Sequence, residues 1–153
     1  MKKKCTMAIG VLVCCLMIMA SGAAWCGNYE PIPSNGTILD SNTGLFWLKN
    51  ANCFGKQTWD QAMSSAASLK SGSCGLTDGS TAGKWRLPTI DELKARQKNQ
   101  QGFNSVQSYY YWSGSTYSYD ISNALEVGMN DGGVYNDVKT YNGLYVWPVR
   151  AGQ

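Results

Sequence analysis

The chain has 153 residues and six cysteines but no histidine, and its 13 Lys and Arg against 10 Asp and Glu give a formal net charge of +3. This length predicts a single domain. Without histidine, no Ser-His or Cys-His nucleophile arrangement can be built. The basic excess is typical of proteins that bind nucleic acid or anionic surfaces, provided that it belongs to the folded domain.

The N-terminus has the features of an export signal. Three lysines precede an apolar run over residues 7–19, which ends in small residues. This order predicts a signal peptide over residues 1–24, with cleavage before Ala24 or before Trp25. An uncleaved anchor is the alternative, because the run counted to Trp25 approaches the roughly 20 residues that span a bilayer. The small residues favour cleavage, so no stable membrane span is expected afterwards.

Signal cleavage changes the charge of the protein that remains. The three lysines near the N-terminus account for the whole basic excess, so ten basic residues then face ten acidic residues. A neutral domain gives no electrostatic reason to expect a nucleic-acid partner. We therefore expect an exported protein that is periplasmic, displayed on the cell surface or secreted.

Two cysteines lie deep within the predicted domain. In an oxidising compartment, Cys53 and Cys74 are expected to form a disulfide. Closing a loop of about 20 residues stabilises a domain by roughly 3 kcal/mol in the chain-entropy model. A zinc site would need about four Cys or His ligands, so no metal is predicted. Cys26 is either removed with the signal or left near the new N-terminus.

The predicted domain opens with an extended segment and a hairpin. Residues 25–34 hold two prolines without apolar periodicity, so they are expected to form an extended lead-in to a single domain over residues 35–153. The turn cluster at 40–44 separates apolar runs at 37–39 and 45–48. This pattern predicts a β-hairpin.

A helix and a loop are expected next. Thr58 and Gln61 have the spacing of a capping box, and the apolar residues that follow recur at helical intervals. A helix over residues 59–70 is predicted. Residues 71–83 are rich in Gly, Ser and Thr and are expected to form a loop that Cys74 ties down near its start.

A second capping box is the centre of a dense motif. Thr89 and Glu92 predict a short helix that ends near Asn99, and the residues before it supply buried apolar area. Arg86 is expected to pair with Asp91, with Glu92 or with a backbone carbonyl of a neighbouring strand. We assign a structural role to the motif residues Trp85, Arg86, Leu87, Pro88, Thr89 and Glu92.

The last third of the chain favours strands. Apolar and aromatic runs at 109–112, 124–129, 134–138 and 145–149 predict four strands, with a hairpin turn at 130–133. Early helices followed by late strands predict the α+β class. We expect two helices packed on a small, irregular antiparallel sheet.

The same region offers a candidate ligand surface, because its tyrosines are interleaved with Ser, Thr, Asn and Asp. Tyrosine gives a large contact area at small entropic cost, as in adaptable binding surfaces, although alternate tyrosines of a strand would face the core. The long polar loops at 115–123 and 130–141 are the best candidates. The predicted ligand-binding residues are Tyr117, Tyr119, Asp120, Asp131, Tyr135, Asn136, Asp137 and Tyr141.

Catalysis finds little support in the sequence. A carboxylate pair for glycoside hydrolysis would come from Asp120, Glu126, Asp131 or Asp137, but these residues are expected to form turns and solvated faces. The loop at 79–84 has one residue too few between its glycines to bind phosphate as a P-loop does. No catalytic residue and no cofactor is predicted.

Residues 85–93 have the sequence Trp-Arg-Leu-Pro-Thr-Ile-Asp-Glu-Leu, and further motif segments lie at 40–47, 50–59, 111–115 and 146–150. Together these segments resemble domain-of-unknown-function family 1566, also called the Lcl C-terminal domain after a collagen-like bacterial adhesin. They match in the order of the family and cover nearly the whole predicted domain.

The resemblance implies a C-type-lectin-like fold, which the formylglycine-generating enzymes share. Those enzymes use reactive cysteines late in the domain, whereas here no cysteine follows Cys74. The Glu-Pro-Asn, Gln-Pro-Asp and Trp-Asn-Asp motifs of calcium-dependent lectins are also absent from the sequence. Because a fold does not transfer function, neither activity is expected.

The adhesin resemblance favours a non-enzymatic, exported binding or adhesion module that recognises a glycan or a protein through the later loops. The alternative is a structural or assembly protein of the cell envelope, with its tyrosine-rich face packed permanently on a partner. The sequence leaves the oligomeric state open.

Overall fold

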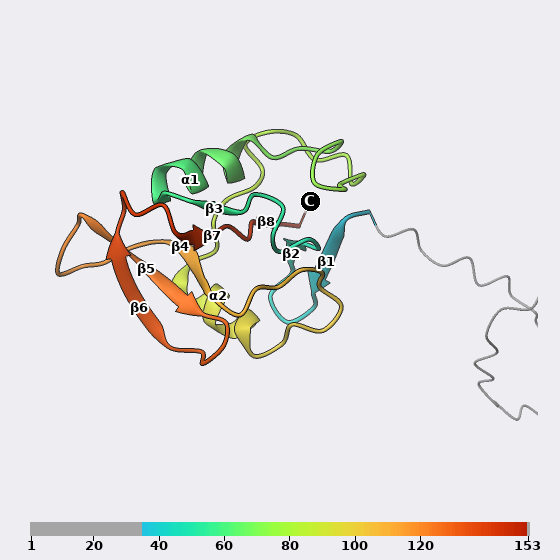
Figure 1. The fold of residues 1–153 in the computed structure, drawn as a ribbon. Coiled ribbons are helices and arrows are strands. Elements are labelled where there is room, and N and C mark those ends of the chain that lie inside the picture. The colour runs from blue at the N-terminus through green and yellow to red at the C-terminus, as the bar shows by residue number, and fades with distance from the viewer. Residues whose placement is uncertain (1–34, 153) are drawn as a thin grey trace, which may run out of the picture. The chain divides into compact units, whose positions relative to one another are not determined.

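The computed structural model describes residues 35–152 (Figure 1). The predicted signal peptide, the lead-in and Cys26 lie outside the described residues. Two helices and two sheets give the α+β class that the sequence predicts. The elements are β1 Thr37–Asp40, β2 Leu45–Leu48, β3 Lys56–Gln57, α1 Trp59–Ser68, α2 Ile90–Gln97, β4 Tyr110–Thr116, β5 Asn123–Gly128, β6 Val134–Val138, β7 Leu144–Tyr145 and β8 Val149–Ala151.

The strands form two sheets rather than the one antiparallel sheet expected. One has the order β1-β2-β8 and the other β3-β7-β4-β5-β6, in which β4 and β7 run parallel. β6 therefore lies at an edge of the larger sheet (Figure 1). The parallel pair arises because the chain leaves β6 at this edge and passes β5 and β4 before it enters β7.

The first hairpin and both capping boxes form as the sequence predicts. In the hairpin turn, the Asp40 carbonyl accepts a hydrogen bond of 2.8 Å from the Gly44 amide. Thr58 caps α1 together with Gln61, and the corresponding box begins α2. α1 ends at Ser68, two residues before the predicted end, because Leu69 is extended and buried.

The prediction of one strand over residues 145–149 is wrong. Its two ends belong to different sheets, since β7 pairs with β3 and β4 whereas β8 pairs with β2. Trp147 and Pro148 separate them, and proline has no amide hydrogen to donate to a strand ladder. The Trp147 indole instead donates to the Leu48 carbonyl at 2.8 Å, and the Leu48 amide donates to the Pro148 carbonyl at 3.1 Å.

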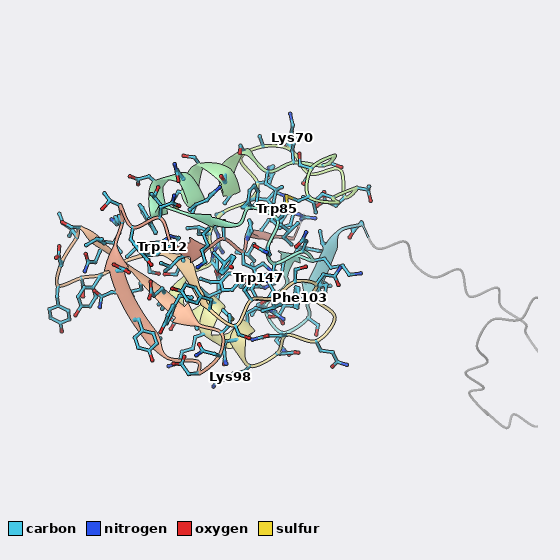
Figure 2. All side chains as sticks on the ribbon, in the orientation of Figure 1. Lys70, Trp85, Lys98, Phe103, Trp112 and Trp147 are labelled. Carbon is cyan, nitrogen blue, oxygen red and sulfur yellow. A yellow bond between two sulfur atoms is a disulfide. The ribbon has the colours of Figure 1, made fainter. Side chains whose placement is uncertain are left out.

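The core lies on both faces of the larger sheet. On one face, Leu93 of α2 packs in a cluster with Tyr111, Val127 and Trp147. On the other, α1 contributes Ala62 and Ala66 to a cluster that includes Trp112. Figure 2 shows Trp112, Trp147 and Phe103 inside the domain, whereas Lys70 and Lys98 extend outward. The helices thus cover opposite faces, and each buries one side of the sheet.

The predicted disulfide joins Cys53 to Cys74, with Cα atoms 5.7 Å apart. It anchors the loop between α1 and α2, which has no regular secondary structure over residues 71–83, as predicted. Cys74 has a φ of 53° and lies in the left-handed region. A conformation that side-chain-bearing residues rarely adopt is thus held at the point where the loop is cross-linked.

The same loop carries a buried polar network. The Trp85 indole donates to the Ser80 hydroxyl at 2.9 Å, and this hydroxyl donates to Asp78 at 2.7 Å. Asp78 also pairs with Arg150 of β8 at 3.0 Å, and less than a tenth of either side chain is exposed. Burial alone would raise the pKa of Asp78, but hydrogen bonds from Ser80 and Arg150 outweigh it and lower the pKa.

The motif around the second capping box has the structural contacts expected of it. Arg86 forms a bidentate pair with Glu92, at 2.7 and 2.8 Å, and its backbone exchanges two hydrogen bonds of 2.9 Å with Val149. Glu92 also accepts from the Thr89 amide at 2.8 Å. Of the three partners considered for Arg86, the structure uses Glu92, and Arg86 donates in addition to its neighbour, the Leu87 carbonyl.

Replacing both Cys53 and Cys74 with alanine is expected to lower the free energy of unfolding by about 3 kcal/mol, because the open loop regains conformational entropy in the unfolded chain. Urea unfolding followed by circular dichroism measures the loss. The control is Ser73→Ala, at an exposed neighbour in the same loop, which should change stability by less than about 0.5 kcal/mol. A loss below that value in the double variant would contradict the prediction.

Asp78→Ala is expected to cost about 3–5 kcal/mol, because it leaves the buried Arg150 guanidinium without its counter-charge. Thermal and urea unfolding both report the loss. Asp91→Ala, at an exposed acid in the first turn of α2, is the matched control and should cost at most about 1 kcal/mol. Equal losses of unfolding free energy in the two variants would contradict the prediction that the buried Asp78–Arg150 pair contributes more to stability than an exposed acid.

Candidate functional site

A tyrosine cluster lies on the larger sheet, with Tyr110 and Tyr135 on its α1 side and Tyr145 of β7 reaching the cluster from the α2 side. Register partners in antiparallel strands share a face, and Glu126 of β5 pairs with Trp112 on β4 and with Tyr135 on β6. Asp137 lies on the same face, opposite Ala124. We define the tyrosine cluster as Tyr109, Tyr110, Tyr135, Tyr141 and Tyr145 together with Glu126 and Asp137.

The rings of the cluster meet edge to face. Tyr110 lies 5.3 Å from Tyr135 with an interplanar angle of 84°, and 5.1 Å from Tyr109 with an angle of 71°. Tyr109 also meets Tyr145 at 6.2 Å and 86°. A hydrogen bond between the hydroxyls of Tyr141 and Tyr109 raises the pKa of Tyr141. Aromatic pairs prefer this arrangement, so the rings hold one another in place.

Two glycines leave room for two of these rings. A Cβ on Gly133 would lie 2.5 Å from the Tyr135 ring, and one on Gly143 would lie 2.4 Å from the Tyr141 ring. Asp131 fixes Tyr135 further, because its carboxylate accepts the Tyr135 hydroxyl at 2.8 Å and the Gly133 amide at 2.9 Å. Both tyrosines are thereby folded back onto the cluster.

Glu126 is the unusual group of the cluster. Only 5% of its surface is exposed, and its Oε2 atom is buried without a hydrogen-bond partner among the described residues. Burial first, and then the negative charge of Asp137, raise the pKa of Glu126 to about 7. The expectation that Glu126 belongs to a solvated face is therefore wrong. Strand alternation places it beneath the tyrosines, which its neighbours in the sequence do not reveal.

The eight predicted ligand-binding residues do not form one patch. Tyr135, Asp137 and Tyr141 belong to the tyrosine cluster, and Asp131 is bonded to it. Asn136 faces the opposite side of the sheet, in register with Leu125, and accepts a hydrogen bond from Asn123 at 2.8 Å.

The remaining three lie in the loop between β4 and β5. Tyr117 and Tyr119 pair there with ring centroids 5.5 Å apart, and 87% of Tyr119 is exposed. Asp120 accepts the Ser122 amide at 2.9 Å, as a turn former does. This loop is a separate aromatic element from the tyrosine cluster.

Lys56 of β3 is a member of the site that the sequence gives no reason to select. Its ammonium lies 3.9 Å from the centroid of Tyr109 and 5.3 Å from that of Tyr145. Lys56 also lines an open polar pocket of about 560 Å³, together with Gln57, Asp60, Gln61, Ser64, Ser65 and Asn142. The pocket therefore adjoins the tyrosine cluster.

Inorganic cations find no obvious site in the part of the chain that the structure describes. Over residues 35–152, no three Cys, Asp or Glu side chains converge closely enough to hold a metal ion.

Neither of the described helices has the length and apolar character needed to cross a bilayer. The chemistry of the described site therefore rests on aromatic rings, hydroxyls, amides and carboxylates.

These features define a small disulfide-linked α+β domain with an exposed tyrosine-rich face. Residues 36–150 match the model of the Lcl C-terminal domain. The chain belongs to this family, as its motifs indicate. No curated protein matches the chain significantly.

The raised pKa of Glu126 predicts a stability that falls with increasing pH. An unfolded glutamate ionises near its ordinary pKa of 4.5, whereas in the folded protein the pKa is about 7. Between these values the folded state binds more protons, so stability is lost as the pH rises through this window. Relative to Glu126→Gln, the wild type should lose on the order of 2–3 kcal/mol between about pH 5 and pH 8.

Urea unfolding at a series of pH values tests this expectation. Asp137→Asn is a second variant to measure. Removal of its negative charge should lower the pKa of Glu126, so the pH range over which stability is lost should move to lower pH. Asp60→Asn, at an exposed acid, should leave the window unchanged. Parallel pH profiles for the wild type and Glu126→Gln would contradict the assignment.

Proposed function

We propose that this domain is an exported, non-enzymatic binding or adhesion module that recognises a glycan or a protein. The observation that carries the proposal is the position of the exposed apolar side chains. Among the described residues, six of the eight large exposed apolar side chains lie between residues 119 and 141. They are divided between the β4–β5 loop, the two faces of β6 and the segment after β6, so the proposal rests on the pair Tyr135 and Tyr141, which belong to the tyrosine cluster and are both exposed.

The composition of the surface supports ligand recognition. Tyr135 and Tyr141 each expose more than two fifths of their surface. Their rings occupy the space beside Gly133 and Gly143, and Tyr135 packs edge to face on Tyr110. Rigid aromatic rings bind at small entropic cost. The adjoining polar pocket offers amide, hydroxyl and carboxylate groups that suit the hydrogen bonds of a glycan or a peptide.

Export and a C-type-lectin-like fold are part of the proposal. The disulfide between Cys53 and Cys74 is typical of an oxidising compartment outside the cytoplasm. Two helices, small sheets and a long loop region agree in class with a lectin-like domain. Membership of a family named after an adhesin adds support, although a fold alone assigns no function.

A second candidate is a structural or assembly protein of the cell envelope. It is favoured by the edge strand β6, on which Val134 and Val138 are 42% and 46% exposed. Exposed edge strands pair readily with further chains. Analytical ultracentrifugation of the purified protein separates the candidates, because a stable oligomer that buries β6 favours assembly and a monomer favours reversible binding.

Binding is tested on glycan and protein arrays with the intact protein. The Tyr135→Ala and Tyr141→Ala variants should each lower the affinity for a captured ligand about tenfold, as expected for central aromatic contacts. Leu39→Ala, at a 52% exposed residue of the other sheet, is the control. No binding at high micromolar concentration, or equal binding by all variants, would refute the proposal.

A further inference from the structure

Two buried arginines show how this domain combines charge with aromatic rings. Arg96 pairs with Asp40 at 2.6 Å, and its guanidinium carbon lies 4.9 Å from the centroid of Trp47 and 5.0 Å from that of Phe103. Cations at such distances from a ring face are attracted by its quadrupole. One acid, two rings and one cation thus form a complete group.

Arg150 forms a second group of the same composition. It pairs with Asp78 at 3.0 Å and lies 4.4 Å from the centroid of Phe46 and 5.4 Å from that of Trp85. In both groups the cation offsets the cost of burying a carboxylate, and the rings add to the attraction.

The tyrosine cluster has the same components but lacks a paired cation at its exposed end. Tyr110, Tyr135 and Tyr141 supply rings, and Glu126 and Asp137 supply acids. The three ion pairs of the described residues involve neither acid. The buried Oε2 atom of Glu126 has no hydrogen-bond partner there, so the group that would complete the arrangement is a cation.

The other end of the cluster shows that an ammonium fits against these rings. Lys56 places its ammonium over Tyr109, 3.9 Å from the centroid. Tyr135 and Tyr141 face solvent with 42% and 43% of their surface. A cation from outside the domain can therefore reach the rings at this end.

We propose that the exposed end of the tyrosine cluster, formed by Tyr110, Tyr135 and Tyr141 above Glu126 and Asp137, binds an organic ammonium group of the ligand. The inference rests on the proposed function and specifies the chemistry of its ligand. The ammonium lies against the faces of the exposed tyrosines and is attracted by Asp137 and by the carboxylate of Glu126 beneath them. Two sources present this chemistry, a lysine side chain and a quaternary ammonium headgroup.

Binding of a cation couples to the ionisation of Glu126. Asp137 raises the pKa of Glu126, whereas a bound cation opposes that effect and favours the ionised form. The charged and titratable groups on this side of the sheet are Asp137 and Tyr135 from β6, Tyr110 from β4, Lys139 and Tyr141 from the segment after β6, and Lys56 at the far end. The Lys139 ammonium donates to the Thr116 hydroxyl at 3.0 Å and lies over the Trp59 ring. Since Glu126 must lose its proton to attract the cation fully, affinity should increase as the pH rises through about 7.

Calorimetric titration of the intact protein tests the proposal with two pairs of probes. Choline is compared with its neutral carbon isostere, and a lysine peptide with the same peptide containing norleucine. We expect saturable binding of at least one ammonium probe and at least fivefold weaker binding of its neutral partner. The pair with the larger difference identifies the source. Equal binding within both pairs, or no binding of either ammonium probe, would overturn the inference.

Variants locate the site. Tyr135→Leu and Glu126→Gln should each weaken ammonium binding at least fivefold, and Glu126→Gln should abolish its increase with pH. Tyr119→Leu, in the separate loop, should bind as the wild type does. Tyr135→Phe keeps the ring and controls for altered packing in Tyr135→Leu, so it should retain binding within about twofold. Unchanged affinity in both Tyr135→Leu and Glu126→Gln would refute this location.

The array experiment and the calorimetric titrations test the two proposals separately. If array ligands bind and Tyr135→Ala weakens them, but the ammonium probes do not bind, the cation inference fails and the binding function stands. If neither arrays nor probes give binding, both proposals fail.

Discussion

The passage of the chain from β7 to β8 is the constraint on which the rest of the domain depends. Within a few residues it pairs with both sheets, and between them it buries Trp147 against Trp47, Phe103 and Tyr111, with ring centroids 4.9 to 5.7 Å apart. Neither sheet has its full set of strands without this segment. Arg150, which follows at its end, ties the loop after α1 to the same centre through Asp78.

Signals that act within a few residues were readable from the sequence. The capping boxes at Thr58 and Thr89 begin helices where expected, because their partners lie three residues away. The β1–β2 hairpin and β6 follow from turn residues and apolar runs for the same reason. The sequence motifs also predicted the family, since residues 36–150 match the model of the Lcl C-terminal domain.

Features that depend on distant partners were not readable. Residues 145–149 look like one strand, yet the two halves join different sheets because Trp147 finds its partner in Leu48. β3 is only two residues long and exists through its pairing with β7. No local pattern marks either event, since both are decided by tertiary contacts.

Only part of the candidate site could be predicted from the sequence, because the rest depends on how distant strands pair. Composition pointed to the tyrosines, and Tyr135 and Tyr141 both belong to the tyrosine cluster, through Tyr110 and Tyr109 respectively. The register that turns Glu126 toward them and Asn136 away from them is set by pairing across β4, β5 and β6. A shift of one residue would exchange the two faces. The space beside Gly133 and Gly143 is likewise visible only once the rings are placed.

The pairing of β2 with β8 also determines when the domain can form. Leu45 and Ala151 are partners across nearly the whole described chain, and such distant contacts fold slowly because a long loop must close first. The early hairpin cannot bury its core-facing side until the last strand arrives. A ribosome-bound chain therefore stays incomplete until synthesis has passed β8. Such late completion is compatible with the proposed export if the chain crosses the membrane before it folds.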